Sequence, residues 1–270
     1  MLLFRRFFTF RGKGGFFMQE LSLESNSFSI FSKNYWIEAA KQRKNTKMLV
    51  IAALITALRV IVKLPIFRIQ IAEGLSVTLD AYVNSLGSVI YGPVIALMVG
   101  AVSDILGLLV TGQMGQYFPP FTLVEMSSSF IFALFFWRQR INFKKILAAK
   151  FTVNFVCNII LTSLFNKWMY FLYYGIERAE AYSLINGVRI AKNLVLFPIE
   201  ASLIAIVLTA ALPVVARLGI ADKKYCTVER PARANFVLQI AIFTALSIGL
   251  VLLYVFFLKD IIAELNIKLW

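Results

Sequence analysis

The chain contains no histidine and only two cysteines among its 270 residues. The absence of histidine excludes imidazole metal ligands, histidine axial ligands of haem and histidine general bases. Cys157 lies in an apolar stretch and Cys226 in a basic one. A disulfide between them is not expected, and free thiols are the default interpretation. We therefore expect no metal site and no cofactor.

Motifs for nucleotide hydrolysis and related chemistry are also missing. The stretch RGKGG at residues 11–15 lacks the spacing of a GxxxxGK[ST] phosphate loop. The chain has neither an HExxH pair nor a paired aspartate-rich diphosphate motif, and its first residues lack the order of a secretory signal peptide. We therefore expect a protein that is not an enzyme and that hydrolyses no ATP itself.

Acidic residues are few, with 14 Asp and Glu against 28 Lys and Arg, a formal net charge of +14. In a soluble protein this excess would suggest a nucleic-acid partner. Here the basic residues gather at residues 5–47, 138–145 and 216–233. These blocks fall at every second connection between apolar stretches, as in cytoplasmic segments of membrane proteins. The distribution of charge therefore predicts a cytoplasmic N-terminus and attraction to anionic lipid. We expect no nucleic-acid partner.

Long apolar stretches dominate what is present. Hydrophobic residues make up 60% of the chain and the mean hydropathy is +0.77, which indicates an integral membrane protein. Each span needs roughly 20 apolar residues and must pair its own backbone groups, so the predicted fold class is all-α. Seven spans are expected, at residues 48–66, 77–91, 93–111, 121–137, 146–166, 189–216 and 235–258.

These spans predict four parts in a multi-pass protein of the cell membrane. Residues 1–46 form a basic cytoplasmic extension, and residues 47–217 form a membrane domain of six helices. A cytoplasmic linker at 218–234 leads to an additional transmembrane helix and a C-terminal tail at 235–270. No internal repeat is strong enough to indicate an inverted-repeat carrier.

The stretch RIAKNLVLFPIE at residues 189–200 places Arg189, Lys192, Asn193 and Glu200 on one helical face. A basic side chain at the bilayer centre costs about 2.5–3.5 kcal/mol on insertion scales, so we expect this face to look into protein or water. The alternative is that Arg189 and Lys192 extend to the outer headgroups. Glu200 lies deeper and argues against that alternative for the face as a whole.

Other polar groups are expected to converge on the outer half of the bundle. Asp104 lies among small residues of the third span, where it is either a buried, paired acid or a ligand contact. The combination of cations, acids and aromatic rings indicates a pocket for a planar, hydrogen-bonding, anionic solute. The candidate ligand-binding residues are Arg59, Arg68, Asp104, Tyr117, Phe118, Thr122, Glu125, Arg189, Lys192 and Asn193.

The first span contains a pair of small residues four positions apart, Ala53 and Ala57. Such a pair lets another helix approach at backbone distance. The partner helix could belong to another subunit or to the sixth span of the same chain.

Several short motifs, taken in order, resemble the substrate-binding S components of energy-coupling factor (ECF) vitamin transporters, in particular their folate family. They are the small-residue first helix, FRIQI (67–71), YGPVIALMVGAVSDILG (91–107), YFPPFTL (117–123) and RIAKNLVLFPIE, which together cover about residues 47–217. The resemblance implies a six-helix S-component bundle that binds a vitamin from outside, with folate or a related pterin preferred. It also implies docking through Ala53 and Ala57 onto a transmembrane coupling subunit driven by two ATPase subunits.

The resemblance also implies that Arg68, Phe118, Arg189 and Lys192 lie at or near the ligand. Arg and Lys would hold the carboxylates of folate. Asp104 or Glu125 would accept from the pterin ring while Tyr117 or Phe118 stacks on it.

Two departures from the family pattern lie near the expected site. Pro120 replaces a usual glycine and is expected to stiffen a loop, and Asp80 and Asn84 occupy a segment that is more apolar in the family. Substrate identity therefore stays open. The alternatives are an S component for another vitamin such as pantothenate or riboflavin, a solitary ion-coupled carrier with Asp104 or Glu200 as proton site, and a structural or signalling membrane protein without a small ligand.

Overall fold

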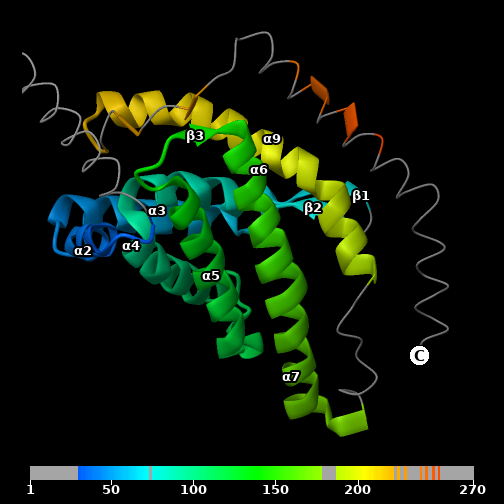
Figure 1. The fold of residues 1–270 in the computed structure, drawn as a ribbon. Helices are drawn as coiled ribbons and strands as arrows, with labels where there is room; N and C mark the ends of the chain where they lie inside the picture. The colour runs from blue at the N-terminus through cyan, green and yellow to red at the C-terminus, as the bar shows by residue number, and fades with distance from the viewer. Residues whose placement is uncertain are drawn as a thin grey trace, which may run out of the picture.

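The computed structural model describes residues 30–72, 75–177 and 187–221, together with residues 224, 225, 228, 229, 238, 241, 242, 245, 246 and 249. Most of these residues are helical, which confirms the all-α membrane fold class (Figure 1). The predicted seventh span at 235–258 and the first 29 residues lie almost entirely outside the described residues.

Long helices form the body of the molecule (Figure 1). A π-helical segment, η3, joins α6 to α7, so that residues Phe143–Tyr174 form one helical run. This run, α4, α5 and Arg189–Arg217 are each long and apolar enough to cross a membrane, and α2 with α3, bent by 75°, makes a fifth candidate. The helices are α2 (Lys33–Gln42), α3 (Thr46–Val62), α4 (Asp80–Val110), α5 (Pro119–Phe136), α6 (Phe143–Thr152), η3 (Val153–Leu161), α7 (Thr162–Tyr174) and α9 (Gly187–Arg217), with the short turns η1 (Pro65–Phe67) and η2 (Met114–Gln116).

Four short strands accompany the helices in the described part of the chain. Strands β1 (Ile69–Ala72) and β2 (Leu75–Val77) form an antiparallel hairpin between α3 and α4, and β3 (Ile141–Asn142) pairs in parallel with β4 (Val228–Glu229). Helix α3 therefore runs from α2 at one end of the bundle to the β-hairpin at the other. These two ends are called the α2 end and the β-hairpin end below.

Helix α4 is two helices joined by a sharp turn at Gly92, where φ is +79°. A straight helix of this length would separate its ends by about 45 Å. Instead Asp80, at the start, and Thr111, just after the end, line one cavity, so the two arms double back on each other. The predicted YGP turn between the second and third spans is thereby confirmed. Pro93 starts the second arm, where its missing N–H is not needed.

Replacing Gly92 with alanine should destabilise the protein by about 2–4 kcal/mol. A Cβ at this position would lie 2.7 Å from the indole ring of Trp137 and would also have to adopt the left-handed backbone conformation. Thermal unfolding in detergent measures the effect. Gly175 also has a positive φ of +87° but faces open space, so Gly175→Ala isolates the backbone cost and should shift the thermal midpoint less. Equal shifts for both variants would show that contact with Trp137 contributes nothing.

Proline residues set two helix boundaries that differ from the prediction. The first span was expected to reach residue 66, but α3 ends at Val62 because Pro65 forces Leu64 out of the helical conformation. The prediction that Pro120 stiffens a loop is wrong. Pro119 and Pro120 occupy the first turn of α5, where backbone N–H groups have no helical partner in any case.

The buried core lies where α4, α5, α6 and α9 meet. Its largest fully buried side chains include Tyr91, Phe132, Phe136, Ile204 and Leu208. Many apolar residues on the outside of these helices are exposed, which suits contact with lipid chains. A smaller cluster at the α2 end packs Tyr35 and Ala39 of α2 against Trp137.

Candidate functional site

A cavity of about 280 Å³ opens at the β-hairpin end of the bundle. It brings together the end of α3, both ends of α4 and the first half of α5. Most of its lining side chains are polar or charged, which is unusual inside a membrane domain and indicates a functional site. The lining residues are Lys63, Thr78, Asp80, Asp104, Gly107, Leu108, Thr111, Gln113 and Glu125.

Behind the cavity wall, the fully buried Arg59 connects three helices. Its Nε and Nη2 atoms donate to the two carboxylate oxygens of Asp80 at 2.8 and 2.7 Å. Nη2 also donates to Glu125 at 2.9 Å, and Nη1 donates to Ser129 at 3.1 Å. This bidentate geometry is the strongest form of ion pair available to arginine. Arg59 thus fixes the positions of Asp80 and Glu125 and does not itself line the cavity.

Lys63 reaches the cavity from the end of α3. Its Nζ lies 3.8 Å from Glu125 and donates to the backbone oxygen of Ser103 at 3.4 Å. Gly107 makes room for it, because a Cβ there would lie 2.9 Å from the Lys63 side chain. Lys63 and Arg59 therefore share the same Glu125 oxygen, Oε2.

Asp104 faces the cavity from the second arm of α4. Thr122 donates its hydroxyl to Asp104 Oδ2 at 2.7 Å, and the Tyr117 hydroxyl lies 3.5 Å from Thr122. This hydrogen bond uses one carboxylate oxygen and fixes the orientation of the group. A carboxylate has about four lone-pair sites, so Asp104 retains acceptor capacity for a ligand.

The charges around the cavity sum to −1, because Asp80, Asp104 and Glu125 outnumber Lys63 and Arg59 by three to two. Asp80 is satisfied by Arg59, and Glu125 is shared between Arg59 and Lys63. Asp104 makes no ion pair within the described part of the chain. Asp104 is therefore a negatively charged acceptor for hydrogen-bond donors of a ligand. The cavity suits a ligand group that donates hydrogen bonds better than it suits a carboxylate.

The polar face of α9 looks into protein. Arg189 donates to Ser163 of α7 at 2.8 Å, and Asn158 of η3 donates to the side chain of Asn193 at 3.0 Å. Deeper in the bundle, Glu200 pairs with the buried Lys150 of α6 at 2.9 Å. These contacts favour the prediction that the polar face of α9 looks into protein. They argue against the alternative that its basic side chains extend to the lipid headgroups. Arg189, Lys192 and Asn193 do not line the cavity beside Lys63.

The remaining candidates lie around the cavity rather than in its wall. Phe118 is buried in an aromatic cluster, with its ring centroid 5.5 Å from Phe121 and 5.8 Å from Trp168. This cluster joins the start of α5 to α7. Arg68 directly precedes β1 and is exposed, and its Nε donates to Ser76 of β2 at 2.8 Å.

Ala53 and Ala57 lie on the outer face of α3 and are exposed. They share this face with the exposed apolar residues Leu54, Leu58 and Ile61. The alternative that this small-residue pair packs against α9 is therefore not supported, and the surface is open to another subunit or to lipid.

Sequence reasoning left Lys63, Thr78, Asp80 and Gln113 out of the candidate set, although all four line the cavity. Asp80 carried a signal, since a carboxylate at the start of an apolar span needs a partner. Its partner Arg59 lies 21 residues earlier, on the far side of a β-hairpin that the hydropathy pattern does not reveal.

The chain was compared with models of known protein families. The model of the family described as "ECF transporter, substrate-specific component" matches residues 47–220. The chain belongs to this family. The matched range contains every residue that lines the cavity, whereas α2 precedes it.

Two relatives of this ECF component are named "Folate transporter FolT". The protein from Clostridium novyi (strain NT) is 30% identical over 139 residues, which cover 52% of this chain and 73% of that protein. The protein from Leuconostoc mesenteroides subsp. mesenteroides is 25% identical over 158 residues, covering 58% and 81%. A solved structure, "Crystal structure of FolT bound with folic acid", is 25% identical with a TM-score of 0.46, covering 58% of this chain and 88% of the solved one.

Proposed function

We propose that this ECF component binds folate or a related pterin in the cavity beside Lys63 and Asp104. Two relatives bear the name of folate transporters, which favours this vitamin class. The observation that supports the proposal most directly is the polar cavity itself, with Asp104 available as an acceptor. A pterin presents an amino group and a ring N–H side by side, and a carboxylate can accept from both.

The volume of the cavity favours the ring end of the ligand. Pockets for drug-sized molecules occupy roughly 300–1,000 Å³, and this cavity of about 280 Å³ lies just below that range. Its net negative charge disfavours the two carboxylates of a folate tail. In this proposal the pterin enters the cavity and the glutamate tail stays outside, towards the β-hairpin end where Arg68 is exposed.

Binding to the purified full-length chain tests this function. We expect folate to bind with a stoichiometry of one by isothermal titration calorimetry in detergent. Pteroic acid, which keeps the ring and lacks the glutamate, should retain most of the affinity, whereas p-aminobenzoyl-glutamate should bind poorly. Tight binding of riboflavin or pantothenate with no response to folate would reject the pterin assignment and favour the alternative vitamins.

The same proposal assigns the outer face of α3 to docking on a transmembrane coupling subunit that works with two ATPase subunits. Replacing Ala53 and Ala57 together with tryptophan should leave folate binding intact and abolish uptake, since the bulky rings would keep the partner helix at a distance. Vitamin uptake by cells that express the complete transporter measures the effect. Leu164→Trp, a change at an exposed site on α7, is the matched control and should transport normally. Normal uptake by the Ala53→Trp/Ala57→Trp variant would contradict the docking assignment.

A further inference from the structure

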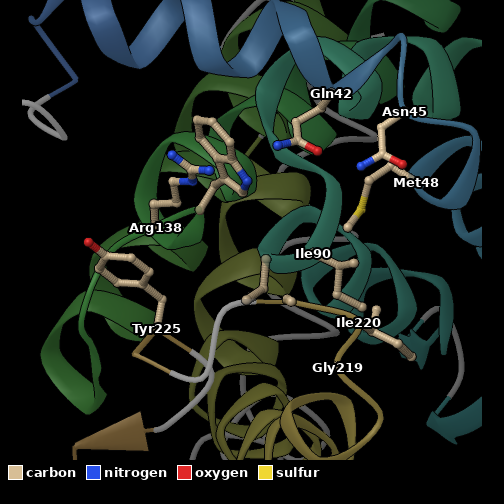
Figure 2. Close-up of a pocket in the computed structure, with 11 residues that line it drawn as sticks. Gln42, Asn45, Met48, Ile90, Arg138, Gly219, Ile220 and Tyr225 are labelled. Atoms are coloured by element: carbon tan, nitrogen blue, oxygen red, sulfur yellow. The ribbon is translucent and has the colours of Figure 1, made fainter.

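A second cavity, of about 310 Å³, lies at the α2 end of the bundle (Figure 2). The bend between α2 and α3, the first arm of α4, the end of α5 and the chain after α9 form its wall. Polar groups from Gln42, Asn45 and Arg138 share this wall with the apolar side chains of Met48, Ile90 and Trp137. Gln42 and Asn45 precede residues 47–220, so the cavity depends on a part of the chain outside the family match.

Arg138 has an unusual backbone conformation that places a guanidinium at this cavity. It directly follows Trp137, the residue that caps the end of α5, and its φ is +52°. Helices that end in a left-handed residue usually have glycine or asparagine there. The Arg138 guanidinium lies 5.0 Å from the centre of the Trp137 ring, and its Nη2 is 3.7 Å from Glu38. The fold accepts the unfavourable conformation and holds a cation beside the indole.

Gln42 supplies an acceptor that lacks a donor. Its Oε1 atom is buried and has no hydrogen-bond partner among the described residues. Buried polar atoms are nearly always paired, so an unpaired one needs an explanation such as a missing ligand. Figure 2 shows the Gln42 amide and the Arg138 guanidinium in the upper part of the close-up, above Ile220 and Gly219.

The second cavity is surrounded by exposed basic residues, as expected for a site at the membrane surface. Helix α2 is bent by 75° from the membrane-spanning α3, and Arg43, Lys44 and Lys47 are exposed at the bend. Lys41 donates to Glu38 at 2.9 Å. Basic clusters at a bilayer surface attract anionic lipids.

We propose that this cavity binds the headgroup of an anionic phospholipid whose headgroup has a free hydroxyl, with phosphatidylglycerol as the model ligand. The phosphate would lie against Arg138, because guanidinium and phosphate form charge-assisted hydrogen bonds. The headgroup hydroxyl would donate to Gln42 Oε1 and satisfy that acceptor. The acyl chains would follow the exposed apolar residues Leu49 and Val50 at the start of α3. This site is separate from the proposed vitamin site and does not depend on it.

Native mass spectrometry of the delipidated full-length chain tests the proposal. The protein in neutral detergent is titrated with phosphatidylglycerol, phosphatidylcholine or phosphatidylmethanol of identical acyl chains. Phosphatidylmethanol has the same charge as phosphatidylglycerol and no hydroxyl. We expect about tenfold stronger retention of phosphatidylglycerol than of phosphatidylcholine, a difference of about 1.4 kcal/mol. Phosphatidylcholine has the same phosphate, but its cationic choline would be repelled by the basic residues and it lacks the hydroxyl.

Two variants separate the phosphate contact from the hydroxyl contact. Arg138→Gln should remove the preference for anionic lipid, whereas Gln42→Leu should keep that preference and lose discrimination between phosphatidylglycerol and phosphatidylmethanol. Lys144→Gln, a change at an exposed basic residue early in α6, is the matched control and should bind as the unmodified protein does. Thermal unfolding of each variant verifies that it is folded.

Three results would overturn the proposal. The first is equal retention of phosphatidylglycerol and phosphatidylcholine by the unmodified chain. The second is an equal loss for Lys144→Gln and Arg138→Gln, which would indicate general surface charge. The third is equal binding of glycerophosphoglycerol, the same headgroup without acyl chains, which would identify a soluble phosphodiester and reject the lipid.

Discussion

Replacing Arg59 with methionine is expected to destabilise the protein by about 3–5 kcal/mol, the cost of removing one partner from a buried ion pair. Methionine keeps much of the side-chain length and removes the charge. Asp80, which is 9% exposed, would lose both of its bonds to the guanidinium, and Glu125 would lose one. The loss is measurable as a lower thermal midpoint of the detergent-purified protein.

A double variant distinguishes loss of the ion pair from loss of packing. Arg59→Met combined with Asp80→Asn removes both charges of the central pair, so most of the lost stability should return. Arg68→Met, at an exposed arginine of the β-hairpin, is the matched control and should change stability by less than about 0.5 kcal/mol. If the double variant were less stable than Arg59→Met alone, the ion pair would not be the cause.

Replacing Asp104 with asparagine is expected to weaken folate binding about 100-fold. The asparagine amide has nearly the same shape but offers one oxygen acceptor, and its NH₂ group would face the donors of the ligand. Each hydrogen bond to a charged group is worth about 1.5–3 kcal/mol, so losing one accounts for a change of this size. Calorimetric titration with folate measures it.

Variants of Thr122 and Glu177 serve as comparisons for the Asp104→Asn variant. Thr122→Val removes the hydrogen bond that orients the Asp104 carboxylate and should reduce affinity only a few fold. Glu177→Gln, a change at an exposed acid beyond α7, should leave binding unchanged. If Asp104→Asn bound folate normally while the unmodified chain also bound it, the vitamin assignment would stand and the acceptor role of Asp104 would be wrong.

Hydropathy and glycine placement predicted much of the membrane domain. The all-α fold, the positions of the main spans and the reversal at Gly92 followed from apolar runs and a YGP turn, because both signals act locally along the chain. The predicted end of the fifth span was wrong. The prediction stopped at residue 166, whereas α7 continues to Tyr174, since Asn166 and Lys167 lower the hydropathy without ending the helix.

The candidate site was less predictable, because its geometry depends on contacts between distant residues. Asp104, Thr122 and Glu125 were all among the candidate residues, and the structure brings Thr122 and Asp104 into hydrogen-bond contact. The role of Arg59 behind the wall could not be read from sequence. The sequence around an arginine in a membrane span does not indicate whether its side chain contacts a ligand or pairs with carboxylates on other helices.

The ion pair of Arg59 also constrains how the chain enters the bilayer. Helix α3 is synthesised before α4, and an unpaired arginine within it opposes transfer into lipid by about 2.5–3.5 kcal/mol. The neutralising carboxylate of Asp80 follows 21 residues later, at the first turn of α4. We therefore expect the ion pair to favour insertion of α3 together with the start of α4 during biosynthesis.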